Sequence, residues 1–166
     1  IPVNLLQDDI PGADKEVILN NSISLLEYKL ADGIQKIKRQ TRQVVAFTSG
    51  QGELNPLQTA SLENDLSNSY AVNRINLDSI VQIPSEIKVL IIAKPTEEFS
   101  EAHLFMLDQY IMNGGHVMFL IDPLIVSLDS INQNKSYIPP PYNLGLDPLL
   151  FKLGARVNPN LVLDLQ

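Results

Sequence analysis

A chain of 166 residues, of which 45% are hydrophobic, is long enough to form one globular domain that buries most of its apolar side chains. Its 12 basic and 19 acidic residues give a net charge of −7, which disfavours nucleic acid as a partner because the phosphate backbone is also negative. The absence of cysteine excludes disulfide bonds, a thiolate nucleophile and a thiolate-bound metal.

Residues 1–13 contain two prolines and a glycine and are predicted to form an extended lead-in. From 14 to 40 the pattern predicts one long amphipathic helix, with Asp14 as its N-cap. Apolar residues recur at steps of three and four along it and share one face, called here the apolar stripe: Leu19, Ile23, Leu26, Leu30, Ile34 and Ile37. We interpret this helix as packing on the sheet of its own domain; a contact with a partner or a stalk is the alternative.

The stretch from Val44 to Pro56 has the strongest local signals in the chain. Val44–Phe47 is a short apolar run, typical of a strand that is buried on both faces of a parallel sheet. Gly50 and Gly52 allow a tight turn, and Asn55 followed by Pro56 is a good start for a helix. A strand, a glycine turn and a capped helix in this order open a doubly wound α/β domain.

The next elements continue this alternation. Residues 55–69 are predicted to form a crossover helix, with Leu62 and Leu66 facing inward. Residues 70–77 form a strand whose polar side chains place it at a sheet edge, whereas the apolar run Ile87–Ala93 is a central strand.

A second crossover helix is predicted over 100–113, followed by a buried strand over 116–121. The buried side of the helix comprises Leu104, Leu107 and Ile111. Because parallel crossovers are right-handed, this spacing predicts a three-layer, mainly parallel, flavodoxin-like sheet of order 2-1-3-4 with helices on both faces.

The remaining residues break the rhythm of strands and helices. Residues 130–142 are polar and then proline-rich, and are interpreted as an ordered surface loop or hinge rather than a docking peptide. A short helix is predicted over 146–153, and a late strand over 156–163 is predicted to be the last strand of the sheet. We therefore expect residues 1–166 to form a single α/β domain, and we expect the chain to be a piece of a longer, membrane-anchored protein.

Enzymatic signatures are weak. Gly50-Gln51-Gly52 starts like a dinucleotide fingerprint, but the third glycine would fall at Asn55, and Glu53 would place a negative charge beside a pyrophosphate. A nucleophilic Ser49 would need a base, and His103 and His116 are both predicted to lie out of its reach.

Glu53 and Asp122 are predicted at the carboxyl edge of the sheet, where two acids could pair or bind a metal, but capping of neighbouring backbone amides is the favoured reading. We predict no catalytic residue, no metal and no cofactor. Instead, the strand ends are predicted to form an interaction crevice from Ser49, Gly50, Gln51, Gly52, Glu53, Lys94, Thr96 and Asp122. Two alternatives are a saccharide or nucleotide site in the same crevice and, third, a hydrolase that uses Ser49.

The order of these motifs resembles the extracytoplasmic auxiliary domain of bacterial ABC-type transport systems, and within them the GldG family of gliding-motility proteins of Bacteroidetes. The residues that carry the resemblance are Val44–Glu53, Leu66 with Tyr70–Val72, Val89–Pro95, Leu107–Gly115, His116–Pro123, Asn143–Leu146, Leu149–Leu150 with Gly154, and Val162–Asp164. Related domains often have histidine where this chain has Gln51, which weakens any chemistry that needs an imidazole there. The family is also similar to a domain of intraflagellar-transport proteins and, more distantly, to class I glutamine amidotransferases, whose elbow cysteine has no counterpart here.

The resemblance implies a non-catalytic module on the periplasmic side of the inner membrane. Its expected partners are the permease and the ATPase of an ABC complex that serves gliding motility or a linked secretion apparatus.

Overall fold

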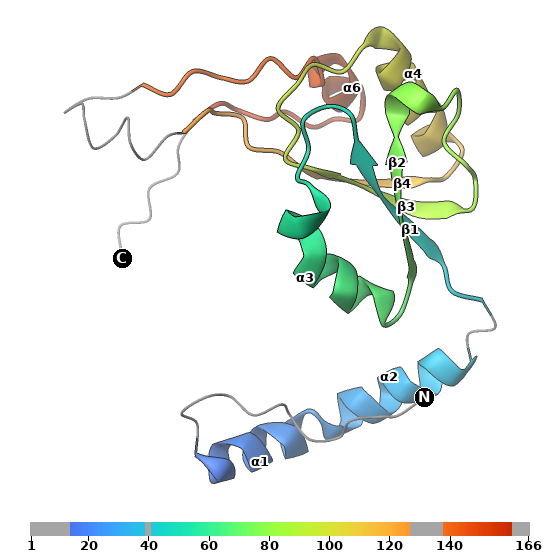
Figure 1. The fold of residues 1–166 in the computed structure, drawn as a ribbon, viewed down its shortest axis with the longest axis vertical. Coiled ribbons are helices and arrows are strands. Elements are labelled where there is room, and N and C mark those ends of the chain that lie inside the picture. The colour runs from blue at the N-terminus through green and yellow to red at the C-terminus, as the bar shows by residue number, and fades with distance from the viewer. Residues whose placement is uncertain (1–13, 39–40, 127–137, 161–166) are drawn as a thin grey trace. The chain divides into compact units, whose positions relative to one another are not determined.

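The structure is a computed structural model that describes residues 14–38, 41–126 and 138–160. The chain divides into two compact units, Ile1–Arg42 and Gln43–Gln166. Figure 1 shows the helices and strands of both units. The single domain expected over 1–166 stays a prediction.

The described part of the first unit is helical, but in two segments rather than one. Helix α1 spans Lys15–Ser24 and helix α2 spans Leu26–Lys38. Near the junction, the Ser22 hydroxyl donates to the Ile18 carbonyl at 2.7 Å. Such hydroxyl bonds to the preceding turn compete with the helical ladder and bend helices, and the junction at Leu25 follows three residues later.

The N-cap position of this helical segment is where the sequence predicted it, but the predicted capping bond is absent and the apolar stripe is exposed. Asp14 lies at the N-cap position of α1, but its side chain makes no capping hydrogen bond. Every member of the apolar stripe is exposed, with fractions between 39% and 72%. The packing of this helix on the sheet stays a prediction. Among the described residues, no helix combines the length and the apolar character that a membrane crossing requires.

The second unit is built on a four-stranded sheet in which all neighbouring strands are parallel. Its strands are β1 (Val44–Ser49), β2 (Ala71–Asn76), β3 (Ile87–Ala93) and β4 (His116–Leu120), in the order β2-β1-β3-β4. The predicted order 2-1-3-4 is therefore confirmed. Of the predicted late strand, residues 156–160 have no strand structure and residues 161–163 lie outside the described residues.

Helices cover the two faces of this sheet and form the outer layers of a three-layer α/β fold (Figure 1). Helix α3 (Pro56–Ser67) packs on one face through Leu66. Helices α4 (Glu101–Met112) and α6 (Asp147–Lys152) pack on the other, and a short 3₁₀ turn, η1 (Leu77–Ser79), follows β2.

Strand β3 is buried on both faces of the sheet, so its side chains belong to two hydrophobic cores. Leu90 and Ile92 contribute to the core beneath α4 and α6, whereas Ile91 and Ala93 contribute to the core beneath α3. All four are at most 5% exposed. Successive side chains of a strand point to opposite faces, so a strand buried on both sides must be apolar throughout.

The predicted start of α3 is confirmed in its details. The Asn55 side chain accepts hydrogen bonds from the backbone N–H groups of Leu57 and Gln58, at 3.0 and 3.1 Å. The Gln58 side chain in turn accepts from the Asn55 N–H at 3.0 Å, which completes a capping box ahead of Pro56.

Two expectations about burial are wrong. Leu62 is 44% exposed, and Thr59 is the buried residue of α3 instead, because a polar contact described below draws it inward. Strand β4 is not buried: Met118 and Leu120 are 51% and 41% exposed. As an edge strand it packs only through Val117 and the alternate residue Phe119, which face the α4 side.

The described end of the proline-rich stretch is paired with the chain that follows β4. The Ile125 N–H donates to the Pro140 carbonyl at 2.9 Å and the Tyr142 N–H to the Pro123 carbonyl at 3.0 Å. This pairing fits an ordered loop; residues 130–137 of the predicted loop lie outside the described residues.

Candidate functional site

The predicted crevice residues lie at the carboxyl ends of β1, β3 and β4, and we call Ser49–Glu53, Lys94–Thr96 and Asp122 the carboxyl-edge rim. The loops after β1 and β3 are joined directly. The Gln51 carbonyl accepts from the N–H groups of Thr96 and Glu97, both at 3.0 Å, and the Thr96 hydroxyl donates to the Gly52 carbonyl at 3.1 Å. The third strand end joins through an ion pair of 3.1 Å between Lys94 and Asp122.

Glycine is required in this loop by conformation and by space. Gly52 has φ +71°, and a Cβ built there would lie 2.0 Å from the Thr96 hydroxyl. Gly50 has φ +115°, and its Cβ would lie 2.8 Å from a side-chain oxygen of Asp78. The two glycines therefore let the β1 loop approach the neighbouring loops closely.

Glu53 folds back on its own loop instead of facing another acid. Its carboxylate accepts from the Gln51 N–H at 2.7 Å, which is the amide-capping role that the sequence favoured. Asp122 takes a different role, since it pairs with Lys94 rather than capping an amide. A second oxygen of Glu53 and the side-chain oxygen of Gln51 are buried without a hydrogen-bond partner among the described residues.

Asp78 and His103, which were not predicted to belong to the rim, form a chain of contacts with its residue Gln51. The Gln51 side chain donates to Asp78 at 3.3 Å, and the other oxygen of Asp78 lies 3.0 Å from Nε2 of His103. The Nδ1 atom of His103 accepts the Ser100 N–H at 3.4 Å, so in the neutral ring the hydrogen lies on Nε2 and faces Asp78.

His103, which was predicted to lie out of reach of Ser49, bonds to Asp78 and not to Ser49, because α4 begins at the same edge of the sheet as η1. It is 8% exposed, and it connects α4 to the β1 loop through Asp78. The available signal was the spacing Ser100-x-x-His103, which forms a capping box at the start of α4.

Ser49 has no arrangement for nucleophilic attack. Its hydroxyl donates to the Ile75 carbonyl on β2 at 3.1 Å, and no described histidine bonds to it. Nor do three or more metal-ligating acids or histidines gather anywhere in the described part of the chain.

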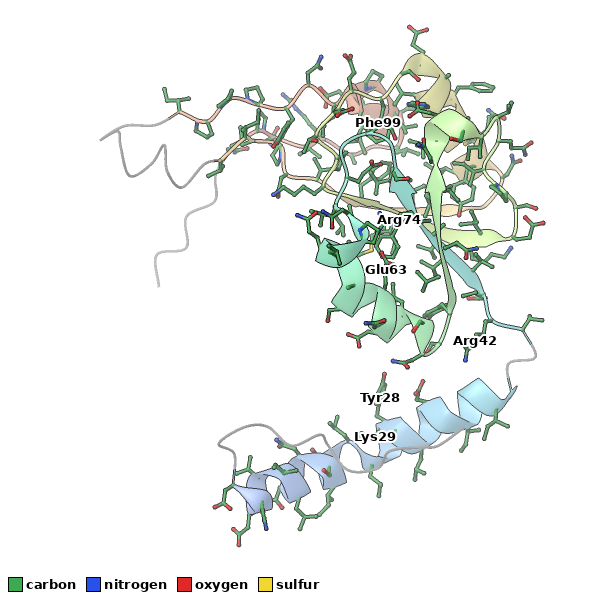
Figure 2. All side chains as sticks on the ribbon, in the orientation of Figure 1. Tyr28, Lys29, Arg42, Glu63, Arg74 and Phe99 are labelled. Carbon is green, nitrogen blue, oxygen red and sulfur yellow. The ribbon has the colours of Figure 1, made fainter. Side chains whose placement is uncertain are left out.

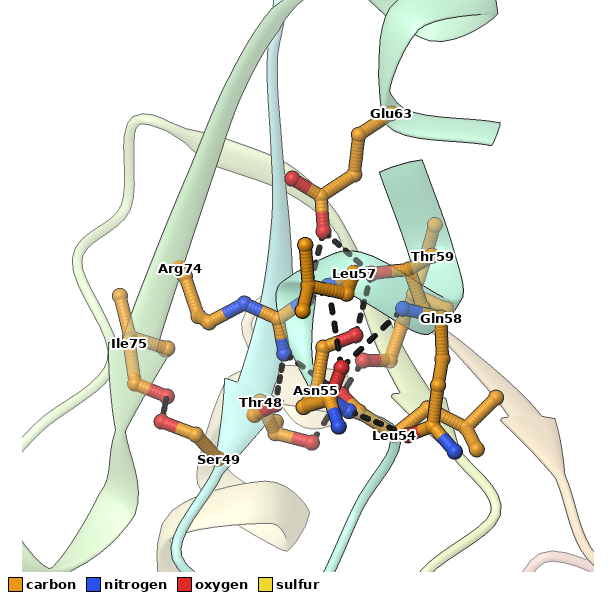
Figure 3. Close-up of polar contacts among 11 residues, drawn as sticks. Thr48, Ser49, Leu54, Asn55, Leu57, Gln58, Thr59, Glu63, Arg74 and Ile75 are labelled. Carbon is orange, nitrogen blue, oxygen red and sulfur yellow. Dashed lines mark hydrogen bonds and ion pairs between the residues drawn. The ribbon is translucent and has the colours of Figure 1, made fainter. Parts of the chain in front are cut away.

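Arg74 on β2 forms hydrogen bonds that connect the carboxyl end of β1 with the start of α3 (Figure 3). Its guanidinium donates to the carbonyls of Thr48 and Leu54, at 3.4 and 3.0 Å, and to the hydroxyl of Thr59 at 2.8 Å. It also pairs with Glu63 across the gap between β2 and α3 (Figure 2). Only 21% of the Arg74 side chain is exposed, so this polar cluster forms part of the packing rather than a free surface charge.

The same contacts set the titration of Glu63. The hydroxyl of Thr59 donates to its carboxylate at 2.6 Å, and this bond together with the guanidinium of Arg74 holds the pKa of Glu63 below its ordinary value, against the opposing effect of burial.

The comparison with known families assigns the α/β unit to a family. Residues 42–166 match the family described as ABC-type uncharacterized transport system. The chain belongs to this family.

Membership of the ABC-type transport family covers the whole α/β unit but says nothing about the residues before it. Among solved structures, the N-terminal domain of mmIFT52 is similar to 49% of this chain, with 24% sequence identity and a TM-score of 0.41. The match covers 37% of that structure's chain, so this chain spans well under half of it. No curated protein matches the sequence.

Proposed function

We propose that this member of the ABC-type transport family is a non-catalytic interaction domain, and that the carboxyl-edge rim is its contact surface. The family supports a transport-associated role. The observation that favours contact over catalysis is the use of the reactive groups at the rim. Ser49 and Glu53 of the rim bond to the Ile75 carbonyl and the Gln51 N–H, and His103 beside the rim bonds to Asp78, so each of them makes a structural contact.

Within this proposal, the partners are the permease and the ATPase of the same ABC complex. The exposed part of the rim is suited to such contacts. Lys94 and Asp122 have 47% and 60% of their side chains exposed, next to loops that are fixed by hydrogen bonds. A preformed surface loses little conformational entropy when it binds.

The finer assignment rests on the motif resemblance given above. We propose that the complex is of the GldG type and serves gliding motility or a linked secretion apparatus in a member of the Bacteroidetes. The domain would then face the periplasm. Protease treatment of spheroplasts that express the full-length protein would cleave this domain if it is periplasmic, and would spare it if it is cytoplasmic.

Charge reversal at the rim tests the contact surface. In the full-length protein, Lys94→Glu combined with Asp122→Lys keeps an ion pair between the two positions but inverts both charges that a partner meets. We expect at least fivefold less permease and ATPase to co-purify with this variant, and reduced colony spreading in a gliding strain. The isolated α/β unit should unfold at the same temperature as the wild type.

Lys152→Ala is the matched control, because Lys152 is 60% exposed but belongs to an ion pair between α6 and α4. It should leave the recovery of both partners unchanged. Normal recovery and normal gliding with the charge-reversed rim would refute the proposed surface.

A further inference from the structure

A cavity lies at the end of the sheet opposite the carboxyl-edge rim. Its volume is about 580 Å³, and it opens between the connection that precedes β3 and the second half of α4. Pockets of a few hundred to a thousand Å³ with mainly apolar walls are typical of small-molecule sites. The apolar lining consists of Val81, Ile83, Ile87, Phe105, Met106 and Tyr110.

The floor of this amino-edge cavity is preformed. Ile83, Ile87 and Tyr110 are each at most 6% exposed, and the Tyr110 hydroxyl donates to the Ile87 carbonyl at 3.0 Å. Gly115 lies directly against the ring, since a Cβ built there would come within 2.3 Å of it. The wall therefore keeps its shape without a ligand.

The mouth, in contrast, is apolar and open to solvent. Val81 is 95% exposed and Phe105 is 65% exposed. Two large apolar side chains that face water beside a hollow are better explained by an occupant that covers them than by packing within the chain.

Lys88 is the one charged residue in the lining, and an irregularity of the sheet puts it there. Val44 pairs with Ile87 but Val45 pairs with Val89, so the register skips Lys88. Ile87 accordingly contributes to the core beneath α4, while Val89 packs on the opposite core. A bulge of this kind re-aims a side chain at the cost of one ladder position, and bulges are frequent beside functional sites.

Lys88 has no ion-pair partner among the described residues, although the whole chain carries a net charge of −7. Apart from the Tyr110 hydroxyl, the other polar lining side chains are uncharged and make no side-chain hydrogen bond within the described part of the chain: Gln82, Ser85, Gln109 and Asn113. An unpaired cation beside apolar walls favours binding of an anionic ligand, and the neutral hydrogen-bond donors of the lining favour the same ligand.

We propose that the amino-edge cavity binds a small amphiphile with an apolar body and a single anionic head group, of which a medium-chain carboxylate is the simplest example. The body lies against the apolar floor and beneath Phe105. The head accepts hydrogen bonds from Lys88.

Isothermal titration calorimetry of the wild-type chain tests this assignment, with decanoate and decyltrimethylammonium below their micelle concentrations and decanol below its solubility limit. We expect saturable 1:1 binding of decanoate, at least tenfold weaker binding of decanol, and no binding of the cation. Lys88→Met keeps most of the apolar stem and should weaken decanoate binding about tenfold, while Lys88→Arg should retain it. Phe105→Ala should weaken decanoate and decanol alike.

Lys152→Met and Leu57→Ala are the matched controls, because both residues belong to the α/β unit, are exposed and lie outside the cavity lining. They should leave decanoate binding unchanged. Amide chemical shifts should move on decanoate addition within 81–88 and 105–115. Absence of saturable decanoate binding by the wild-type chain, equal binding of all three amphiphiles, or shifts confined to other residues would overturn the proposal.

Discussion

Replacing Arg74 by methionine would remove the guanidinium that joins β1, β2 and α3 while keeping most of the apolar stem. Its two best-formed bonds, to the Leu54 carbonyl at 3.0 Å and to the Thr59 hydroxyl at 2.8 Å, contribute about 1 to 1.5 kcal/mol each. The ion pair with Glu63, a partner that is 27% exposed, adds about 0.5 to 1 kcal/mol. We therefore expect Arg74→Met to lower the free energy of unfolding by about 3 kcal/mol.

The assay is urea unfolding of the α/β unit, followed by far-ultraviolet circular dichroism at pH 7. The midpoint should fall while the slope stays constant, since the surface exposed on unfolding is nearly the same. Arg74→Lys keeps the charge but loses the fork that reaches three acceptors at once, and should recover less than half of the difference.

Arg156→Met provides the control, because Arg156 is exposed and makes no hydrogen bond or ion pair within the described residues. It should change the free energy of unfolding by less than about 0.5 kcal/mol. A loss below about 1 kcal/mol for Arg74→Met would refute the reasoning, because the contacts would then be no stronger than those of an exposed surface pair.

Three further predictions are tested by the same unfolding assay. Because the folded-state pKa of Glu63 lies below its ordinary value of 4.5, its stabilising effect is complete above pH 4.5 and is lost as the pH falls through the folded-state pKa. Glu63→Gln should therefore be less stable than the wild type at pH 7 and converge with it in acid; a gap that does not depend on pH would contradict this. Gly52→Ala should cost at least about 1 kcal/mol more than Gly114→Ala, since both have positive φ but only the first meets a neighbour, the hydroxyl of Thr96. Equal losses would show that the close contact is relieved elsewhere. Lys94 has φ +52° without being glycine, so Lys94→Gly should leave the stability unchanged or raise it by up to about 1 kcal/mol, despite the loss of an exposed ion pair. A loss above about 1 kcal/mol would contradict that assignment of strain.

Much of the scaffold of the site could be predicted from short sequence patterns. The run Val44–Phe47 marks β1, and Asn55 with Pro56 marks the start of α3. These signals depend on residues a few positions apart, whose periodicity and capping chemistry are fixed by the local backbone. The same logic placed the carboxyl ends of β1 and β3 side by side, and their loops do bond to each other.

The support beneath the rim was not readable in this way. Asp78 and His103 are separated by 25 positions in sequence and meet only because η1 and α4 begin at the same edge of the sheet. Likewise, Thr59 rather than Leu62 is buried in α3, because Arg74 on a different strand offers it a hydrogen bond. Sequence periodicity carries no information about such a polar partner.

The sequence by itself determined the parallel α/β order and the glycine turn after β1, since these follow from apolar runs, caps and residue types. Only the tertiary structure decided which polar groups share partners, which side of β4 stays open, and where the sheet skips a residue at Lys88. The physical reason is that hydrogen-bond pairing, exposure and register are properties of segments brought together from distant parts of the chain.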